Sequence, residues 1–245
     1  MINEELKIQL RQLADQYETA DFLIKDPAQF MHRFKLPADI EIMGLIASSL
    51  ALGQRKVTLD KLKYICSLMQ GNPEQWIEKK MYQKDFPDSY IKFYRFFSYS
   101  EMRHFFDGIC LLMQNYGTIG NYLYEQQKSG TNPLSAMSGY FVNRGVGAII
   151  PQNTQSACKR LNLYFRWMVR DHSQVDMGLW TWFNKQNLIL PLDTHVMDEV
   201  CRLGLSSNKS TSLSKARELT NLLCKVWPDD PCKGDFALFG VGVNR

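Results

Sequence analysis

Hydrophobic residues recur at helical spacing along most of the chain, and the alternating pattern of a strand is scarce. Helix start and stop residues divide the pattern, for example Pro37 before an apolar run and Gly53 after it. The spacing predicts helices over 6–20, 40–52, 57–69, 88–97, 100–114, 118–127, 133–141, 154–170, 194–203, 212–226 and 234–239. We therefore predict an all-α fold.

Composition is that of an ordinary globular protein, with 245 residues, 45% hydrophobic and 22% charged. The first residues are acidic and lack the basic start and apolar stretch of a signal peptide. The longest apolar run, 42–52, is too short to cross a bilayer. From the sequence we expect a cytoplasmic protein without a membrane partner.

Metal and cofactor motifs are absent from the sequence. None of the six cysteines forms a Cys-x-x-Cys pair, which excludes the usual zinc-ribbon and iron–sulfur spacings. The four histidines form no His-Glu-x-x-His array, and Arg144-Gly145-Val146-Gly147 lacks the lysine of a P-loop. We predict no metal, no iron–sulfur cluster and no cofactor.

The net positive charge of the chain comes entirely from its C-terminal part. Residues 1–140 carry 16 basic and 16 acidic residues, whereas residues 141–245 carry 13 basic and 9 acidic ones. Between Arg144 and Arg170 there are five basic residues and no acidic residue. Such a stretch fits a polyanion partner, and equally well a solvated helix face.

The predicted helix 154–170 has two distinct faces. At about 100° per residue, Arg166 and Arg170 lie within about 20° of Lys159, and Asn162 lies about 60° away. The opposite side is apolar, with Tyr164, Phe165 and Met168 among its residues. The polar face can follow phosphates, or it can carry one lysine activated by neighbouring cations.

Asp193 stands directly before the predicted helix 194–203, within Pro191-Leu192-Asp193-Thr194-His195-Val196. Aspartate is a preferred N-cap residue, because its carboxylate accepts hydrogen bonds from first-turn amides. A capping carboxylate is also held rigidly, and it can stabilise developing positive charge or deprotonate an amine. Capping is the simpler interpretation, and the two roles are compatible.

This segment, continued by Val200-Cys201-Arg202-Leu203-Gly204-Leu205, resembles the catalytic-aspartate segment of the helix-hairpin-helix (HhH-GPD) DNA glycosylases. The resemblance implies a helical bundle of two subdomains flanking a cleft, with Asp193 as the catalytic carboxylate. It also implies that Lys159, after the turn 151–154, is the second catalytic residue. The separation of 34 residues (193 − 159) resembles that of archaeal oxidised-guanine glycosylases.

The whole chain further resembles a bacterial family related to this superfamily, with matching segments at 30–34, 158–162, 166–170, 191–195 and 235–240. The resemblance implies one HhH-GPD-like unit over 1–245, with subdomains 37–140 and 1–36 plus 141–245. Residues expected to contact nucleic acid are Gln54, Arg55, Arg144, Asn162, Arg166 and Arg170. Trp180 and Trp182 are candidates to stack on an extruded base.

The function that follows is base-excision repair of damaged duplex DNA, by a glycosylase with AP-lyase chemistry at Lys159. One departure favours an alternative, a nucleic-acid-binding protein that keeps the fold without the chemistry. The hairpin of typical members reads Leu-Pro-Gly-Val-Gly, and its glycine amides hold a phosphate. The corresponding turn here is Ile150-Pro151-Gln152-Asn153-Thr154.

Overall fold

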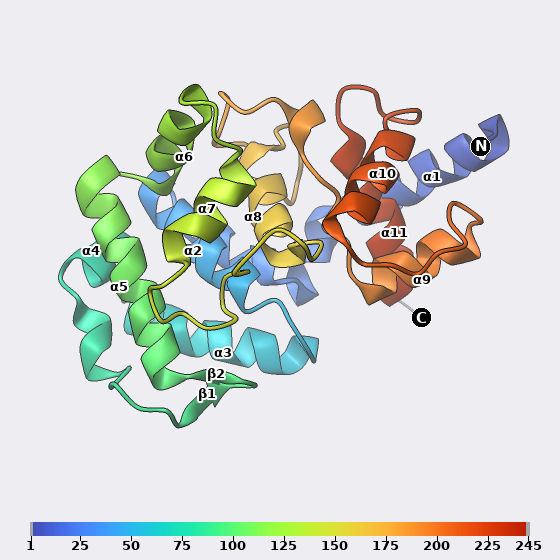
Figure 1. Cartoon of the computed structure of the whole chain (residues 1–245). Coiled ribbons are helices and arrows are strands. Elements are labelled where there is room, and N and C mark those ends of the chain that lie inside the picture. Colours follow the sequence, from blue (N-terminus) through green and yellow to red (C-terminus); the bar gives the residue numbers. More distant parts are fainter. Residues whose placement is uncertain (1, 244–245) are drawn as a thin grey trace. The chain divides into compact units, whose positions relative to one another are not determined.

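The computed structural model describes residues 2–243 and is mostly helical (Figure 1). It divides into two compact units. One unit joins the residues up to Ile24 to those from Thr154 on, and the other comprises Lys25–Asn153. The central unit is longer at both ends than the subdomain 37–140 expected from the sequence. The N-terminal helix and the C-terminal third belong to the same unit.

The central unit is built around one buried helix. Its elements are η2 (Pro27–Arg33), α2 (Pro37–Ser49), α3 (Arg55–Leu68), α4 (Pro73–Glu78), η3 (Met81–Lys84), β1 (Lys92–Tyr94), β2 (Phe97–Ser98), α5 (Tyr99–Tyr116), α6 (Ile119–Lys128) and α7 (Pro133–Phe141). Every residue of α2 from Asp39 to Ser49 is buried. Such a helix needs partners on all sides, and it packs against η2, α4 and α6.

The prediction of a helix over 88–97 is wrong, because this segment forms an antiparallel hairpin. Tyr94 pairs with Phe97, and Arg95 takes φ of +51° in the two-residue turn. The segment is rich in aromatic residues, which favour strands. The hydroxyl of Tyr94 donates to the carbonyl of Leu52 and lies 2.9 Å from the Thr58 hydroxyl. These long-range contacts outweigh the local helical spacing.

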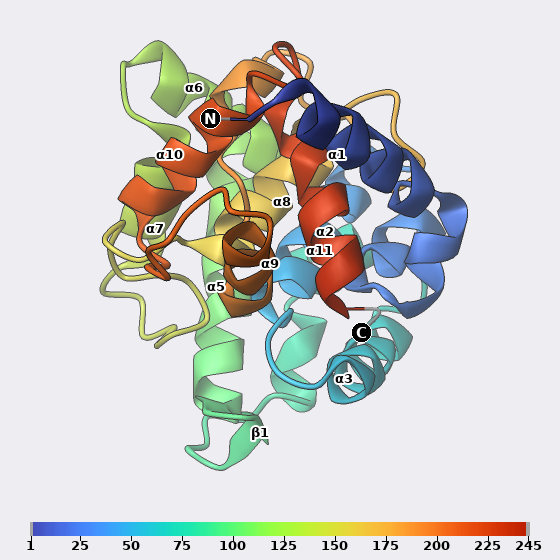
Figure 2. The same cartoon turned by 90° about the vertical axis from the view of Figure 1, so that its right-hand side faces the viewer.

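The other unit contains α1 (Glu4–Tyr17), η1 (Ala20–Lys25, which ends at the boundary), α8 (Lys159–Val169), η4 (Lys185–Asn187), α9 (Thr194–Arg202), α10 (Leu213–Leu223), η5 (Pro231–Lys233) and α11 (Gly234–Val243). α11 packs against both α1 and α9, and Figure 2 shows α1 alongside it. A Cβ at Gly240 would lie 2.3 Å from Cγ of Tyr17. Glycine there lets α1 and α11 approach closely.

Helix α8 begins at Lys159, five residues later than the predicted start at Thr154. The preceding segment forms bends and an isolated antiparallel bridge between Ser156 and Ser212 instead, and the amide of Ala157 donates to the carbonyl of Thr211 at 3.0 Å. Cys158 then takes φ of +48°, a left-handed conformation that turns the chain into the helix. Contact with a segment over fifty residues away therefore sets the helix start.

Remaining differences are small. Helix α7 matches its prediction, and α2, α3, α5, α6, α9 and α10 match within about three residues at each end. The short helix α4 and the 3₁₀ turns were not predicted, because such short elements carry little periodic pattern. Within residues 2–243, no helix has both the length and the hydrophobicity required to span a membrane.

Candidate functional site

Two helix starts bring Lys159 and Asp193 together. Lys159 is the first residue of α8, and Asp193 is the N-cap of α9. The Asp193 Oδ1 accepts a hydrogen bond from the amide of Val196 at 3.0 Å, which confirms the predicted cap. The other oxygen, Oδ2, lies 3.4 Å from the Nζ of Lys159. One carboxylate thus caps a helix and pairs with an amine.

Both members of this pair reach solvent. The side chain of Lys159 is 23% exposed and that of Asp193 is 22% exposed. Partial exposure leaves room for a ligand to approach the two charged groups, whereas full burial would not. The charged group 3.4 Å from the Nζ of Lys159 is a carboxylate, whereas the sequence suggested cations as its neighbours.

Helix α11 forms another wall of the site. The ring centroid of Phe239 lies 5.9 Å from Nζ of Lys159. Asp235 precedes Phe239 by one helical turn, so the two side chains leave the same face of α11. Asp235 is buried at 3% exposure. It makes an ion pair with Arg166, which lies two turns after Lys159 on the same face of α8.

Burial raises the pKa of Asp235 to about 6. The positive charge of Arg166 opposes this shift, the negative charge of Asp193 adds to it, and Lys159 opposes it. Among residues 2–243, Asp235 Oδ1 finds no hydrogen-bond partner. Asp235 is therefore electrostatically coupled to both members of the lysine–aspartate pair, and its charge changes near neutral pH.

The prediction that Arg166 binds phosphate is wrong, because this side chain is buried, with 2% of its surface exposed. Its Nε and Nη2 donate to Oδ1 of Asp176 at 3.2 Å, and its Nη1 donates to Asp235. The guanidinium lies 4.4 Å from the ring centroid of Phe236. Buried arginine is held by carboxylates because an unpaired buried charge is very costly.

The prediction that Arg170 contacts nucleic acid is wrong for the same reason, since this side chain is also 2% exposed. Its Nε donates to Asp230 at 2.9 Å, its Nη1 donates to Asp176, and Glu18 Oε1 lies 2.8 Å from that same Nη1. Arg166 and Arg170 thus form one buried network with four carboxylates. Their charge stabilises the fold of this unit and is not presented to a polyanion.

Asn162, the third residue of the predicted polar face, is buried as well. Its Nδ2 donates to the carbonyl of Ala157 at 2.8 Å, and its amide donates to the carbonyl of Cys158 at 3.0 Å. These bonds fix the turn that leads into α8. Asn162 therefore positions Lys159, and the prediction that it contacts nucleic acid is wrong.

Trp180 and Trp182 stack on each other, with ring centroids 5.7 Å apart and planes 26° apart. Trp180 is 2% exposed and packs edge-on against Tyr164 at 5.2 Å. Tyr164 lies about 140° around α8 from Lys159. Trp180 is a core residue on the face opposite to the lysine, which corrects its assignment to a base pocket. Trp182 is half-buried beside it.

Three predicted contact residues lie in the central unit. Gln54 is exposed at the N-cap of α3, and Arg55 is the first residue of that helix. Arg144 is half-buried, with Nε donating to the carbonyl of Tyr140 at 2.6 Å and the guanidinium 4.3 Å from the Tyr140 ring centroid. Their contact with nucleic acid stays a prediction.

Sequence patterns had missed Asp176, Asp230, Asp235 and Phe239 as parts of this region. Asp235 and Phe239 lie in the segment 235–240, whose resemblance to the bacterial family was the one available signal. Asp176 and Asp230 lie in turn-rich segments that carry no periodic pattern. Among the described residues, no cluster of three or more acidic, histidine or cysteine side chains could hold a metal ion.

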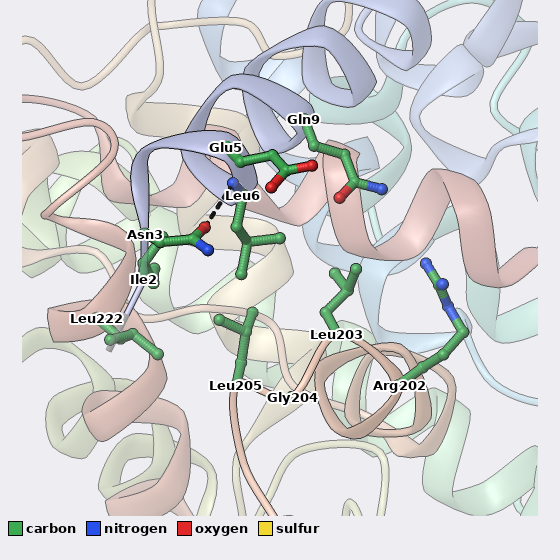
Figure 3. Close-up of a pocket in the computed structure, with 10 residues that line it drawn as sticks. All are labelled: Ile2, Asn3, Glu5, Leu6, Gln9, Arg202, Leu203, Gly204, Leu205 and Leu222. Carbon is green, nitrogen blue, oxygen red and sulfur yellow. Dashed lines mark hydrogen bonds between the residues drawn. The ribbon is translucent and has the colours of Figure 1, made fainter.

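A separate pocket lies at the far end of α9 (Figure 3). It has a volume of about 480 Å³, and its walls come from the start of α1, the end of α9 and α10. Leucine side chains face it together with Arg202, whose Nε donates to Glu199 at 2.8 Å. No residue of the lysine–aspartate pair lines this pocket.

Taken together, fold and site define a mainly helical protein with a lysine–aspartate pair at two helix starts. The chain belongs to the family described as protein of unknown function (DUF2400), whose sequence profile matches residues 26–244. Comparison with curated proteins and with solved structures finds no match to this chain.

Proposed function

We propose that this protein is a DNA base-excision enzyme of the HhH-GPD type, a glycosylase with lyase activity at Lys159. The observation that supports this proposal most directly is the 3.4 Å separation between the amine of Lys159 and the carboxylate of Asp193. A nucleophile beside a base, with the base held by a third group, is the arrangement that covalent catalysis requires. Here the cap on Val196 holds the base.

The chemistry assigns one step to each group. Lys159 loses a proton to Asp193 Oδ2, and its nitrogen lone pair forms a bond to the sugar C1′. The bond between C1′ and the damaged base breaks as its electron pair leaves with the base, which takes up a proton. The nitrogen then loses its remaining extra proton, and its lone pair breaks the bond between C1′ and the ring oxygen O4′. O4′ leaves with the electron pair and takes up a proton, which gives a Schiff base between Lys159 and C1′. The carboxylate also stabilises positive charge that develops on the sugar.

Borohydride trapping tests the covalent step, because borohydride reduces a Schiff base to a stable amine. The wild-type protein, incubated with duplexes that carry oxidised or abasic sites, is expected to give an adduct that Lys159→Ala abolishes. Lys185→Ala is a matched control, because Lys185 also pairs with an aspartate, Asp171, at 2.5 Å and is 30% exposed. The enzymatic proposal would be refuted if the protein gave no adduct and no strand cleavage across a panel of lesions.

Asp193→Asn separates catalysis from capping. Asparagine caps helices about as well as aspartate, so the variant keeps the bond to Val196 and loses the negative charge. We expect near-normal folding and a reduction in adduct formation of about 10²-fold or more, in the range of general-base catalysis. An unchanged rate would show that Asp193 is a cap alone.

A non-catalytic nucleic-acid-binding protein is the second candidate function. The turn 150–154 favours it, because it lacks the glycines whose amides hold a phosphate in typical members. Burial of Arg166 and Arg170 also removes two cations from any DNA contact. This alternative predicts salt-dependent DNA binding that Asp193→Asn leaves unchanged.

A further inference from the structure

The hairpin of the central unit exposes an unusual group of apolar side chains. Tyr90 is 88% exposed, Ile91 is 71% exposed, and Phe96 at the turn is 50% exposed. Single exposed apolar residues are common on proteins, but a group of them gathered on one short element indicates a contact surface. In Figure 1 the hairpin lies beside α3, to which Tyr94 is joined through Thr58.

The hairpin and the neighbouring helix α3 are rich in basic residues. Helix α3 and residues 89–98 together carry six basic residues and one acidic residue, a net charge of +5 (6 − 1): Arg55, Lys56, Asp60, Lys61, Lys63, Lys92 and Arg95. Asp85 and Asp88 precede the hairpin, and Asp88 accepts a hydrogen bond from the Ser100 hydroxyl at 2.5 Å. Cations interleaved with exposed aromatic rings match the phosphates and bases of a nucleic acid strand.

The turn is fixed in place by its own contacts. The Nζ of Lys92 donates to the carbonyl of Phe96 at 2.8 Å, and the Phe96 ring packs edge-on against Phe97 at 5.1 Å. A Cβ at Gly53 would lie 2.2 Å from Nη1 of Arg95, so the Arg95 side chain lies directly over that glycine. Arg95 thus joins the turn to the loop that leads into Gln54 and α3.

We infer that this hairpin and the start of α3 bind single-stranded or locally unpaired DNA, with bases stacked on Phe96 and Tyr90. Lys56, Lys92 and Arg95 are exposed and would contact the backbone phosphates. Stacking fits the occupant better than groove insertion does, because the surface offers two separate exposed rings, those of Phe96 and Tyr90, and not a single wedge. The inference rests on the proposed function only in taking DNA as the substrate, and it needs no catalysis.

Fluorescence anisotropy with the full chain tests this surface, using a labelled oligothymidylate and the same strand annealed to its complement. We expect the single strand to bind more tightly than the duplex. Phe96→Ala should weaken single-strand binding about tenfold, within the range for loss of one stacked base. Phe96→Leu should weaken it similarly, because leucine keeps the apolar area but has no ring.

Matched controls come from α6, where Tyr124 is 38% exposed and lies under the amine of Lys128 at 4.6 Å. Tyr124→Ala and Lys128→Ala should leave the dissociation constant within about twofold. Arg95→Ala gives a readout that needs no ring. In this variant the slope of log affinity against log salt concentration should be smaller in magnitude by about 0.7, the value for one phosphate contact on a single strand.

Three results would overturn the inference. The wild-type chain could bind neither probe at low salt, it could bind the duplex alone with no effect of Phe96→Ala, or Phe96→Leu could bind as tightly as wild type. Thermal unfolding of each variant verifies that the fold is kept. If borohydride trapping at Lys159 fails while binding still depends on Phe96, the proposed enzymatic function is refuted and the DNA-binding surface is not.

Discussion

The two carboxylate oxygens of Asp193 have different partners: Oδ1 accepts from the amide of Val196, and Oδ2 lies 3.4 Å from Nζ of Lys159. The cap orients the carboxylate, and this orientation brings the second oxygen to the amine. Removing the side chain therefore changes the helix start and the ion pair together, whereas removing only the charge changes the ion pair alone.

Asp193→Ala should destabilise the protein by about 1 kcal/mol, the usual cost of losing an N-cap. Asp193→Asn should lie within a few tenths of a kcal/mol of wild type, because the amide oxygen still accepts from Val196. Urea unfolding followed by tryptophan fluorescence measures both. Equal destabilisation by the two substitutions would mean that the ion pair with Lys159, not the cap, stabilises this region.

Arg166→Ala should destabilise the protein by about 3–5 kcal/mol, because it leaves the carboxylate of Asp235 buried without its cation and leaves Asp176 with Arg170 alone. The exposed pair Lys185–Asp171 is the control, and Lys185→Ala should cost less than about 1 kcal/mol. The same urea experiment compares them. A small effect of Arg166→Ala would show that water or rearrangement compensates the two carboxylates.

Ionisation of Asp235 should lower the free energy of unfolding as the pH rises from about 4 to about 6. Its pKa in the folded protein is raised by burial to about 6, above its unfolded value, so the folded state binds more protons in this range. Asparagine at this position does not titrate. As the pH rises through the range, the free energy of unfolding of the wild type should therefore fall by roughly 3 kcal/mol relative to that of Asp235→Asn. Urea titrations of both proteins at several pH values measure the difference, and a constant difference would contradict the prediction.

Gly53→Ala should disturb Arg95 as well as the backbone. Gly53 has φ of +85°, and an added Cβ would meet the Arg95 guanidinium. Gly71 is a matched control, because its φ is +82° and an added Cβ there would meet nothing within 4 Å. Both alanine variants should show a backbone cost of about 1 kcal/mol. Only Gly53→Ala should also weaken binding to oligothymidylate.

Equal binding by the two glycine variants, measured by the same anisotropy titration, would contradict the role given to Arg95. A greater loss of binding with Gly71→Ala would also contradict it, because a Cβ added at Gly71 would meet no atom within 4 Å. Circular dichroism verifies that both variants keep their helical content before the titrations are compared.

Helical periodicity determined most of this fold, because an amphipathic helix repeats its apolar positions locally. Helix α7 and the start of α9 at Thr194 follow from such local patterns, and so does the cap at Asp193. The pairing of Lys159 with Asp193 was expected from resemblance to known glycosylases. The ion pair at 3.4 Å agrees with that expectation and leaves its chemistry to be tested.

Only the tertiary structure decided which charges of α8 face solvent. Lys159, Arg166 and Arg170 share one face by helical spacing, and the sequence predicted one cationic stripe there. Folding brings carboxylates from distant segments against the last two turns, namely Glu18, Asp176, Asp230 and Asp235. A helical pattern records the direction of a side chain and not what packs against it. The two arginines are therefore buried structural cations, and Lys159 stays at the surface beside Asp193.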